Sequence, residues 1–329
     1  MFSLKNLEKR ARDRKKTIVL TESTTSDRVL EATKIILKKQ IANVVLLGEP
    51  EFFATKAKFV KGATIIDYKN SPLAEDFADK LATIRKNKGL TIDMARELIK
   101  DEFYFATMLV YEGYADCMLG GTMSSTASVL RPALQIIKTK ENIKTASSCF
   151  MFVGAKKLGF GENNLLFASD CALNKNPSSE ELKDIVLATC CTAKDIGEIT
   201  PKVAMLSYSS FGSGGEDESI NKIRDAITLV KKEDENILID GEMQLDTALM
   251  PEVAKVKAKD SLVAGRANVL IFPDLTSGNI GYKLIQRFGK LKAIGVIMQG
   301  LNKPVNDLSR GASVEDIVTM TALSTLQCE

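Results

Sequence analysis

Residues 17–47 read TIVLTESTTSDRVLEATKIILKKQIANVVLL and contain the pattern that decides the fold. Two short apolar runs, at 17–20 and 44–47, have the length of buried strands. Between them, the apolar residues of 27–39 recur every three or four positions, which predicts an amphipathic helix. A strand, a helix and a second strand in this order predict a parallel pair joined by a helical crossover.

The same alternation continues along the rest of the chain. Further strands are predicted at 63–66, 117–119, 165–168, 203–208, 237–239, 269–272 and 293–298. Further helices are predicted at 92–111, 179–196, 219–232, 246–254, 281–287 and 313–326. Strands separated by helices of this length indicate an α/β fold with parallel-rich sheets and helices on both faces.

The length of 329 residues is typical of about two domains. We expect a first α/β domain made of 1–145 plus 297–329, and a second α/β domain made of 146–296. The last segment, with its helix at 313–326, is expected to return to the first domain. No Pro/Gly-rich linker marks these boundaries.

The composition excludes several classes of protein. The 45 Lys+Arg and 42 Asp+Glu leave a net charge of only +3, too little to indicate nucleic acid as the main partner. The charged residues 1–16 lack the apolar core of a signal peptide, and the apolar runs are too short to cross a bilayer. We therefore expect a soluble, cytoplasmic protein. With no histidine and no CxxC pair, no metal site is expected.

The absence of histidine also limits the catalytic chemistry. A general base near neutral pH must be Asp, Glu, Lys, Cys or Tyr, and Ser-His-Asp or Cys-His chemistry is excluded. This directs attention to residues 300–318, GLNKPVNDLSRGASVEDIV. Within eight positions, Ser309, Arg310 and Asp316 place a hydroxyl, a permanent cation and a carboxylate.

Part of this segment is also typical of a helix start. Ser313 would be the N-cap, with Glu315 and Asp316 in the first turn. On local pattern alone, this is the commoner explanation of Asp316. It explains Arg310 less well, because a helix start already attracts anions and needs no cation beside it. We interpret Arg310 and Asp316 together as part of an anion site.

Three predicted strand-to-helix loops, at 120–126, 207–215 and 273–279, consist of small and polar residues. Small side chains let backbone N–H groups approach an anion, and the following helix adds positive potential. None of the loops matches a nucleotide P-loop or a dinucleotide-binding turn. Ordinary turns are the alternative for any one loop, but three together favour a polar cleft.

Several sequence blocks then match one known family in order. They are RKNKG at 85–89, LRPALQIIKT at 130–139, DCALNKNP at 170–177, VAMLS at 203–207, DGEMQLD at 240–246, FPDL at 272–275, GNIGYK at 278–283 and the segment at 300–318. Through these blocks the chain resembles, almost end to end, phosphate acetyltransferase within the phosphate acetyl/butyryltransferase family.

The resemblance implies an enzyme that interconverts acetyl-CoA plus phosphate with acetyl phosphate plus CoA. CoA would be a substrate, and no cofactor is implied. The implied fold is isocitrate dehydrogenase-like, with two α/β domains, an active site in the interdomain cleft and a homodimeric assembly. Ser309, Arg310 and Asp316 would be catalytic, and Arg85 and Arg131 would bind substrate anions.

The residue types suit this chemistry. CoA carries a thiol with a pKa of about 8.5, so a positioned carboxylate such as Asp316 can assist its deprotonation. The thiolate then attacks the carbonyl of the acyl phosphate. The forked donors of Arg310 suit phosphate or the developing oxyanion, and Ser309 can donate a hydrogen bond to the sulfur or the carbonyl oxygen. A direct transfer in a ternary complex is expected.

Both arginines have a local alternative. Arg131 precedes Pro132, which fits the first turn of a helix, so it could be an exposed helix-start residue. Arg85 lies in a charged run, for which a solvated face is the alternative. The chain departs from the family at Ser124 and Asn87, where many members have histidine. Those histidines cannot be essential here if the activity is retained.

Three other functions remain open on the sequence. Phosphate butyryltransferase belongs to the same family, and the residues of an acyl pocket cannot be named from the sequence. A metal- and NAD-dependent decarboxylating dehydrogenase would share the fold, although no dinucleotide fingerprint is present. A non-catalytic CoA- or acyl-phosphate-binding module is the third, against which the intact segment from Ser309 to Asp316 argues.

Overall fold

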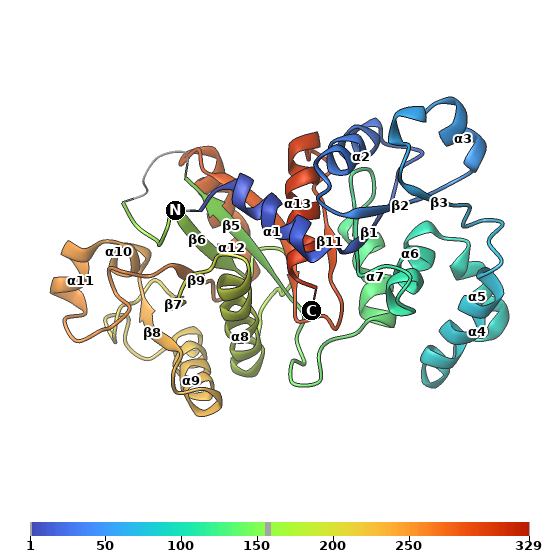
Figure 1. The fold of residues 1–329 in the computed structure, drawn as a ribbon. Helices are drawn as coiled ribbons and strands as arrows, with labels where there is room; N and C mark the ends of the chain where they lie inside the picture. The colour runs from blue at the N-terminus through green and yellow to red at the C-terminus, as the bar shows by residue number, and fades with distance from the viewer. Residues whose placement is uncertain (1, 155–158, 329) are drawn as a thin grey trace. The chain divides into compact units, whose positions relative to one another are not determined.

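The computed structural model of the protein describes residues 2–154 and 159–328 (Figure 1). The chain divides into two compact units, each with its own β-sheet. The terminal unit comprises Ser3–Thr139 and Leu301–Glu329, and the middle unit comprises Phe2 and Lys140–Gly300. All five predicted site residues belong to the terminal unit.

The sheet of the terminal unit has the strand order β11-β4-β1-β2-β3, and all neighbouring strands are parallel. The strands are β1 (Thr17–Leu20), β2 (Asn43–Leu47), β3 (Thr64–Ile66), β4 (Cys117–Gly120) and β11 (Val305–Asp307). The apolar residues of β1, β2 and β4 are buried whichever face they point to, as expected for parallel strands covered by helices on both sides.

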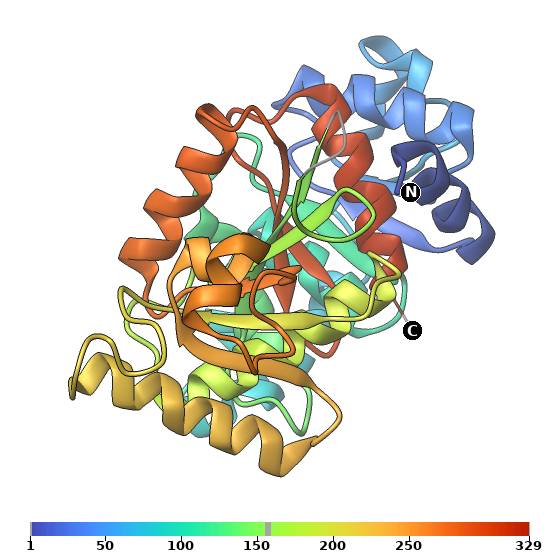
Figure 2. The same cartoon turned by 90° about the vertical axis from the view of Figure 1, so that its left-hand side faces the viewer.

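Helices cover this sheet. They are α1 (Leu4–Arg14), α2 (Asp27–Lys39), α3 (Pro50–Thr55), α4 (Ala74–Arg85), α5 (Ile92–Ile99), α6 (Glu102–Tyr111), α7 (Thr126–Ile136) and α13 (Val314–Leu326). α13 packs against α1 and α2 and lies beside them in both Figure 1 and Figure 2. α6 contacts β4, and α7 contacts β11.

The winding direction of this sheet reverses between β1 and β4. From β1 the chain passes through α2 to β2 on one side, whereas from β4 it enters α7 and later reaches β11 on the other side. Right-handed crossovers in opposite directions place α2 and α7 on opposite faces. The loops after β1 and β4 therefore diverge, and ligands of open parallel sheets bind at such a point, beyond the carboxyl ends of the strands.

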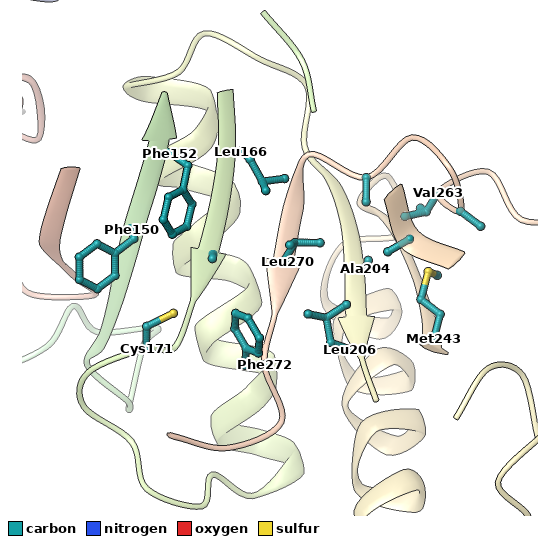
Figure 3. Packing of buried hydrophobic residues seen from close by; sticks show 14 of the residues in the cluster. Phe150, Phe152, Leu166, Cys171, Ala204, Leu206, Met243, Val263, Leu270 and Phe272 are labelled. Atoms are coloured by element: carbon teal, nitrogen blue, oxygen red, sulfur yellow. The ribbon is translucent and has the colours of Figure 1, made fainter. Parts of the chain in front are cut away.

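The middle unit has a mixed sheet with the order β10-β5-β6-β9-β7-β8, in which β5 is antiparallel to β6 and β10 and the other pairs are parallel. Its strands are β5 (Ser147–Val153), β6 (Leu165–Ser169), β7 (Lys202–Leu206), β8 (Leu238–Met243), β9 (Val269–Ile271) and β10 (Lys292–Gln299). Its helices are α8 (Ser179–Asp195), α9 (Glu218–Glu233), α10 (Leu245–Leu249), α11 (Pro251–Lys257) and α12 (Leu275–Arg287). Figure 3 shows its core, where Phe152, Leu166, Leu270 and Leu206 come from four neighbouring strands.

The α/β class and the parallel-rich sheets are confirmed. The predicted helix at 92–111 is two helices, because Asp101 ends the first by capping the N–H groups of the first turn of α6. The predicted helix at 246–254 is also two, since Pro251 opens α11. The predicted loop at 273–279 is mostly the first turn of α12.

Among the described residues, six α-helices and strands have no counterpart among the predicted ones: α1, α3, α4, α7, β5 and β11. They include the helices that carry Arg85 and Arg131 and the strand that leads to Ser309. Among the helices that the structure describes, none is long and apolar enough to cross a membrane.

Candidate active site

Three positions at the carboxyl edge of the terminal unit's sheet carry a polar side chain or begin a polar loop. Glu22 follows β1, Gly121 follows β4, and Asp307 is the last residue of β11. Because β11, β4 and β1 are neighbouring parallel strands, these positions lie side by side. They adjoin the point where the winding reverses, so this edge is where the unit can build a site.

The loop after β4 presents N–H groups to an anion, as predicted, but the anion is a carboxylate of the protein itself. Glu22 Oε2 accepts hydrogen bonds from the N–H of Gly121 (3.0 Å), the N–H of Thr122 (2.6 Å) and the Thr122 hydroxyl (2.7 Å). Glu22 Oε1 accepts one from the Met123 N–H (3.1 Å). Glu22 is only 3% exposed, so it occupies these donors where we expected a ligand.

A second carboxyl group supports Glu22 from the start of α6. Glu102 Oε1 accepts a hydrogen bond from the backbone N–H of Glu22 (2.7 Å). Burial raises the pKa of Glu102 to about 7; this hydrogen bond opposes the rise, and the charges of Glu22 and Asp101 add to it. Near neutral pH, Glu102 is therefore protonated in part of the molecules.

Asp307 lies on the other side of β4 and is 1% exposed. Its Oδ2 accepts a hydrogen bond from the hydroxyl of Thr126 (2.6 Å), the first residue of α7. Its Oδ1 has no hydrogen-bond partner in the part of the chain that the structure describes. Burial raises the pKa of Asp307 to about 6; the Thr126 bond opposes the rise and the charge of Glu22 adds to it.

The connection from β11 to α13 carries Ser309 and Arg310, both exposed. The Ser309 carbonyl accepts a hydrogen bond from the Ala312 N–H (2.8 Å), and its hydroxyl accepts one from the Gly311 N–H (3.2 Å). Among residues 2–154 and 159–328, the Arg310 side chain has no hydrogen-bond or ion-pair partner. Its permanent charge is therefore available to an anion.

Arg28 on α2 holds this connection through its backbone, a role that the sequence did not predict. Its guanidinium donates to the carbonyl oxygens of Arg310 (3.0 Å) and Ala312. It also donates to the carbonyl oxygen of Thr122 (2.9 Å). One side chain thus ties the β11–α13 connection to the loop after β4.

Asp316 lies in the first turn of α13, and the predicted helix start is confirmed. Ser313 is the N-cap, and its hydroxyl accepts a hydrogen bond from the Asp316 N–H (3.2 Å). In return, Asp316 Oδ2 accepts from the N–H (2.9 Å) and the hydroxyl (2.8 Å) of Ser313, which completes a capping box. Asp316 Oδ1 has no such partner among the described residues, so one oxygen stays available.

Arg131 and Arg85 lie on α7 and α4, two helices that contact one another. Both charges reach the same phenol on α6: burial raises the pKa of Tyr104, whereas Arg131 and Arg85 lower it. Neither arginine side chain has a polar partner within the described ranges. The structure therefore brings together two cations that no internal anion neutralises.

The alternative interpretation of Arg131 as a helix-start residue is wrong. α7 begins at Thr126, and its N-cap Ser125 accepts a hydrogen bond from the Ser128 N–H (3.2 Å). Pro132 lies inside the helix, where it has no N–H for the Ser128 carbonyl. Arg131 is exposed further along α7 rather than in its first turn.

The predicted polar loop at 207–215, in the middle unit, also surrounds a carboxylate of the protein. Glu242 accepts hydrogen bonds from the Ser209 hydroxyl (2.9 Å) and the Gly212 N–H (2.8 Å), and it pairs with Arg224 (2.9 Å). Burial raises the pKa of Glu242, but Arg224 and these hydrogen bonds outweigh burial and lower it to about 2. This loop therefore holds an internal ion pair.

The predicted site residues fall into two groups within the terminal unit. Ser309 and Arg310 lie on the β11–α13 connection and Asp316 follows it in the first turn of α13, whereas Arg131 and Arg85 both lower the pKa of Tyr104. α7 connects the two groups, because it carries Arg131 and packs against β11, the strand that leads to Ser309. The residues that the sequence analysis missed are Glu22, Arg28, Glu102 and Asp307. Glu22 and Asp307 each adjoin the end of a strand, which is the only local signal for them.

A free guanidinium next to a hydroxyl, on a connection that leads into a carboxylate-bearing helix start at the carboxyl edge of a parallel sheet, is typical of an α/β enzyme that acts on anionic substrates. The family described as phosphate acetyl/butaryl transferase matches residues 2–325. The chain belongs to this family of transferase enzymes.

Relatives and a solved structure agree with this assignment. The phosphate acetyltransferase of Acetivibrio thermocellus is 46% identical over 331 residues, covering 100% of this chain and 99% of the relative. That of Clostridium acetobutylicum is 45% identical over 323 residues, covering 97% and 96%. A phosphotransacetylase structure from Streptococcus pyogenes matches with a TM-score of 0.91 at 38% identity, covering 99% of each chain.

Proposed function

We propose that the protein transfers an acetyl group reversibly between CoA and phosphate. Its substrate pairs are acetyl-CoA with phosphate and acetyl phosphate with CoA. The observation that carries the proposal is the unpartnered Arg310, which adjoins Ser309 on the connection that leads to the helix start at Asp316. Phosphate and acetyl phosphate are anions, which a free guanidinium binds with two donors. The names of the relatives support the same reaction.

We assign separate roles to Ser309, Arg310 and Asp316. Arg310 binds the phosphoryl oxygens or the oxyanion that develops at the carbonyl. Ser309 donates a hydrogen bond from its hydroxyl to the sulfur or the carbonyl oxygen. Asp316 assists deprotonation of the CoA thiol through Oδ1, since Oδ2 is used in the capping box.

Arg85 and Arg131 hold anionic groups of CoA or phosphate. Both cations reach Tyr104, and neither has a protein partner among the described residues. Two uncompensated arginines on contacting helices suit a ligand with several phosphate oxygens better than a single carboxylate. This supports binding rather than the solvated-face interpretation of Arg85.

The transfer proceeds directly within a ternary complex. CoA already supplies a strong nucleophile, so an acetyl-enzyme would gain little. Ser309 has no histidine to activate it, because the chain contains none. Holding both substrates in one site also contributes proximity, worth about 7–11 kcal/mol of the barrier.

A phosphate-dependent thiol-release assay tests the reaction. The purified protein should release CoA from acetyl-CoA only when phosphate is added. Butyryl-CoA in the same assay measures the acyl-chain preference, and faster release from it would replace the acetyl assignment with a butyryl one. No release from either substrate, together with a nicotinamide absorbance change on a hydroxy acid, would favour the dehydrogenase, which the comparisons do not favour.

We also propose a homodimer in which α12 contributes to the interface. Ile280, Leu284 and Phe288 recur every four residues along α12 and its C-cap, and they are 55%, 49% and 82% exposed. An apolar stripe of this kind is typical of an interface. Light scattering should give twice the monomer mass of 36.0 kDa, and Phe288→Glu should reduce the mass to that of one chain. A monomeric wild-type protein would contradict the assembly.

We place the protein in the cytoplasm. Its six cysteines are free thiols, five of them buried and Cys191 exposed. Thiols persist in reducing compartments, which supports this location. Detection of the protein in a membrane or secreted fraction would count against it.

A further inference from the structure

One partly buried hydrogen bond joins the two groups of proposed site residues. The hydroxyl of Thr126 donates to Asp307 Oδ2 at 2.6 Å. Thr126 is the first residue of α7, the helix that carries Arg131, and Asp307 lies two residues before Ser309. The bond therefore links the start of one substrate-binding helix directly to the end of the strand that leads into the catalytic connection.

The loop after β4 packs closely against this carboxyl group. A Cβ added to Gly121 would lie 2.2 Å from Asp307 Oδ1 and 2.8 Å from the carbonyl oxygen of Leu308. Only a residue without a side chain allows this approach, and the φ of +99° at Gly121 also favours glycine. The loop after β4 and the end of β11 thus pack closely around the carboxyl group of Asp307.

Packing does not explain why this residue is an aspartate. Asp307 is 1% exposed, and its Oδ1 is unbonded among the described residues. A buried carboxylate with an unbonded oxygen lowers stability, so an apolar side chain of similar shape would fit at lower cost. The feature that aspartate supplies is the acceptor for Thr126.

We propose that Asp307 is a positioning residue, which fixes the start of α7 and hence Arg131 relative to Ser309 and Arg310. The inference rests on the proposed function, because Arg131 is taken to hold a substrate anion. Without the hydrogen bond, the start of α7 can shift along the edge of β11. A misplacement of about 1 Å can reduce catalysis about 100-fold.

Four variants test this role. Thr126→Val removes the donor at an exposed position, so the fold should be kept. It should lower kcat/KM about 10- to 100-fold, mainly through a higher KM for the substrate that Arg131 binds. Thr126→Ser and Asp307→Asn keep a donor and an acceptor, and both should stay within about threefold of wild type. Thr55→Val, which removes a hydroxyl bonded only within α3, is the matched control and should be unchanged.

Three results would overturn the inference: a normal Thr126→Val enzyme, a Thr126→Ser enzyme as impaired as Thr126→Val, or a Thr55→Val enzyme impaired to the same degree. The wild-type assay separates this test from the proposed function. If wild-type protein performs no acyl transfer, the function fails, and calorimetric titration of the same variants with CoA and with inorganic phosphate still tests the link. Unchanged affinities of Thr126→Val for both CoA and inorganic phosphate would then overturn it.

Discussion

The β4–α7 and β11–α13 connections leave neighbouring parallel strands at the same edge of one sheet. They differ in whether their charged and polar groups are paired within the protein. In the first, three N–H groups and a hydroxyl are directed at Glu22, a carboxylate of the protein. In the second, Arg310 has no partner among the described residues. The comparison teaches that small polar residues after a strand predict an anion site, but not whether the anion is internal. An unpaired cation marks the connection that is open to a ligand.

The loop at 207–215 in the middle unit repeats the closed arrangement. Glu242 takes its hydrogen bonds and pairs with Arg224, which leaves a pKa of about 2. Two of the three predicted anion loops therefore hold internal carboxylates. The predictions below distinguish residues that act in catalysis from residues that stabilise the fold.

The largest effect is expected at Asp316, at the helix start that follows the open connection. Asp316→Asn keeps an oxygen for the capping box but removes the basic carboxylate, so kcat should fall about 10²- to 10⁴-fold. The KM for acetyl phosphate should change little, because Asp316 is not assigned to binding. Steady-state kinetics measure both constants, with thermal unfolding as the control for the helix start. A variant within about threefold of wild type would make Asp316 only a capping residue.

The next largest effect is expected at Arg310. Arg310→Gln should lower kcat/KM about 10²- to 10³-fold, since it removes a charged donor from the developing oxyanion. Its unfolding temperature should match wild type, because the side chain has no polar partner in the described ranges. Arg310→Lys keeps the charge without the forked donors, so its kcat/KM should lie between those of wild type and Arg310→Gln. An active Arg310→Gln enzyme would remove the distinction between the open and closed connections.

Asp307, at the end of β11, should affect stability and its pH dependence. Burial raises its pKa in the folded state from 3.8 to about 6. The cost of the charge is therefore absent below pH 3.8 and fully present above about pH 6, so stability falls as the pH rises through this window. Relative to wild type, Asp307→Asn should gain about 2–3 kcal/mol between pH 4 and pH 7. Denaturant unfolding at both pH values measures this, and an equal difference at both would refute the assignment.

The smallest effect is expected at the paired arginines. Arg131→Gln should raise the KM of one substrate about 10- to 100-fold and change kcat less, because a charged hydrogen bond contributes about 1.5–3 kcal/mol. Arg85→Lys and Arg131→Lys keep the charge but lose the bidentate geometry, so each should give a smaller rise. If Arg131→Gln binds both substrates normally, this arginine is structural.

The fold could be predicted where a segment's own pattern decides its structure. The apolar runs of β1 and β2 and the periodic helix α2 are present as predicted. β11 could not be predicted, because its three residues include two polar ones, Asn306 and Asp307, that are buried by neighbouring elements. α7 was missed because a polar loop precedes it and Pro132 interrupts it. These elements form through tertiary contacts rather than local propensity.

The candidate site was predictable to the same extent. Ser309, Arg310 and Asp316 lie within one short segment, so their types and spacing were readable. Glu22 meets the loop after β4 about 100 positions along the chain, and Arg28 meets Arg310 282 positions away. No local sequence pattern predicts such long-range contacts. They decide whether a loop that could bind an anion is already occupied by a carboxylate of the protein.

Isotope exchange tests the central claim, direct acetyl transfer, most directly. The protein is incubated with acetyl phosphate and labelled phosphate, first without CoA and then with it. Direct transfer in a ternary complex predicts label in acetyl phosphate only when CoA is present, together with intersecting initial-rate plots for the two substrates. Label incorporated without CoA, accompanied by parallel plots, would show an acetyl-enzyme and contradict the account.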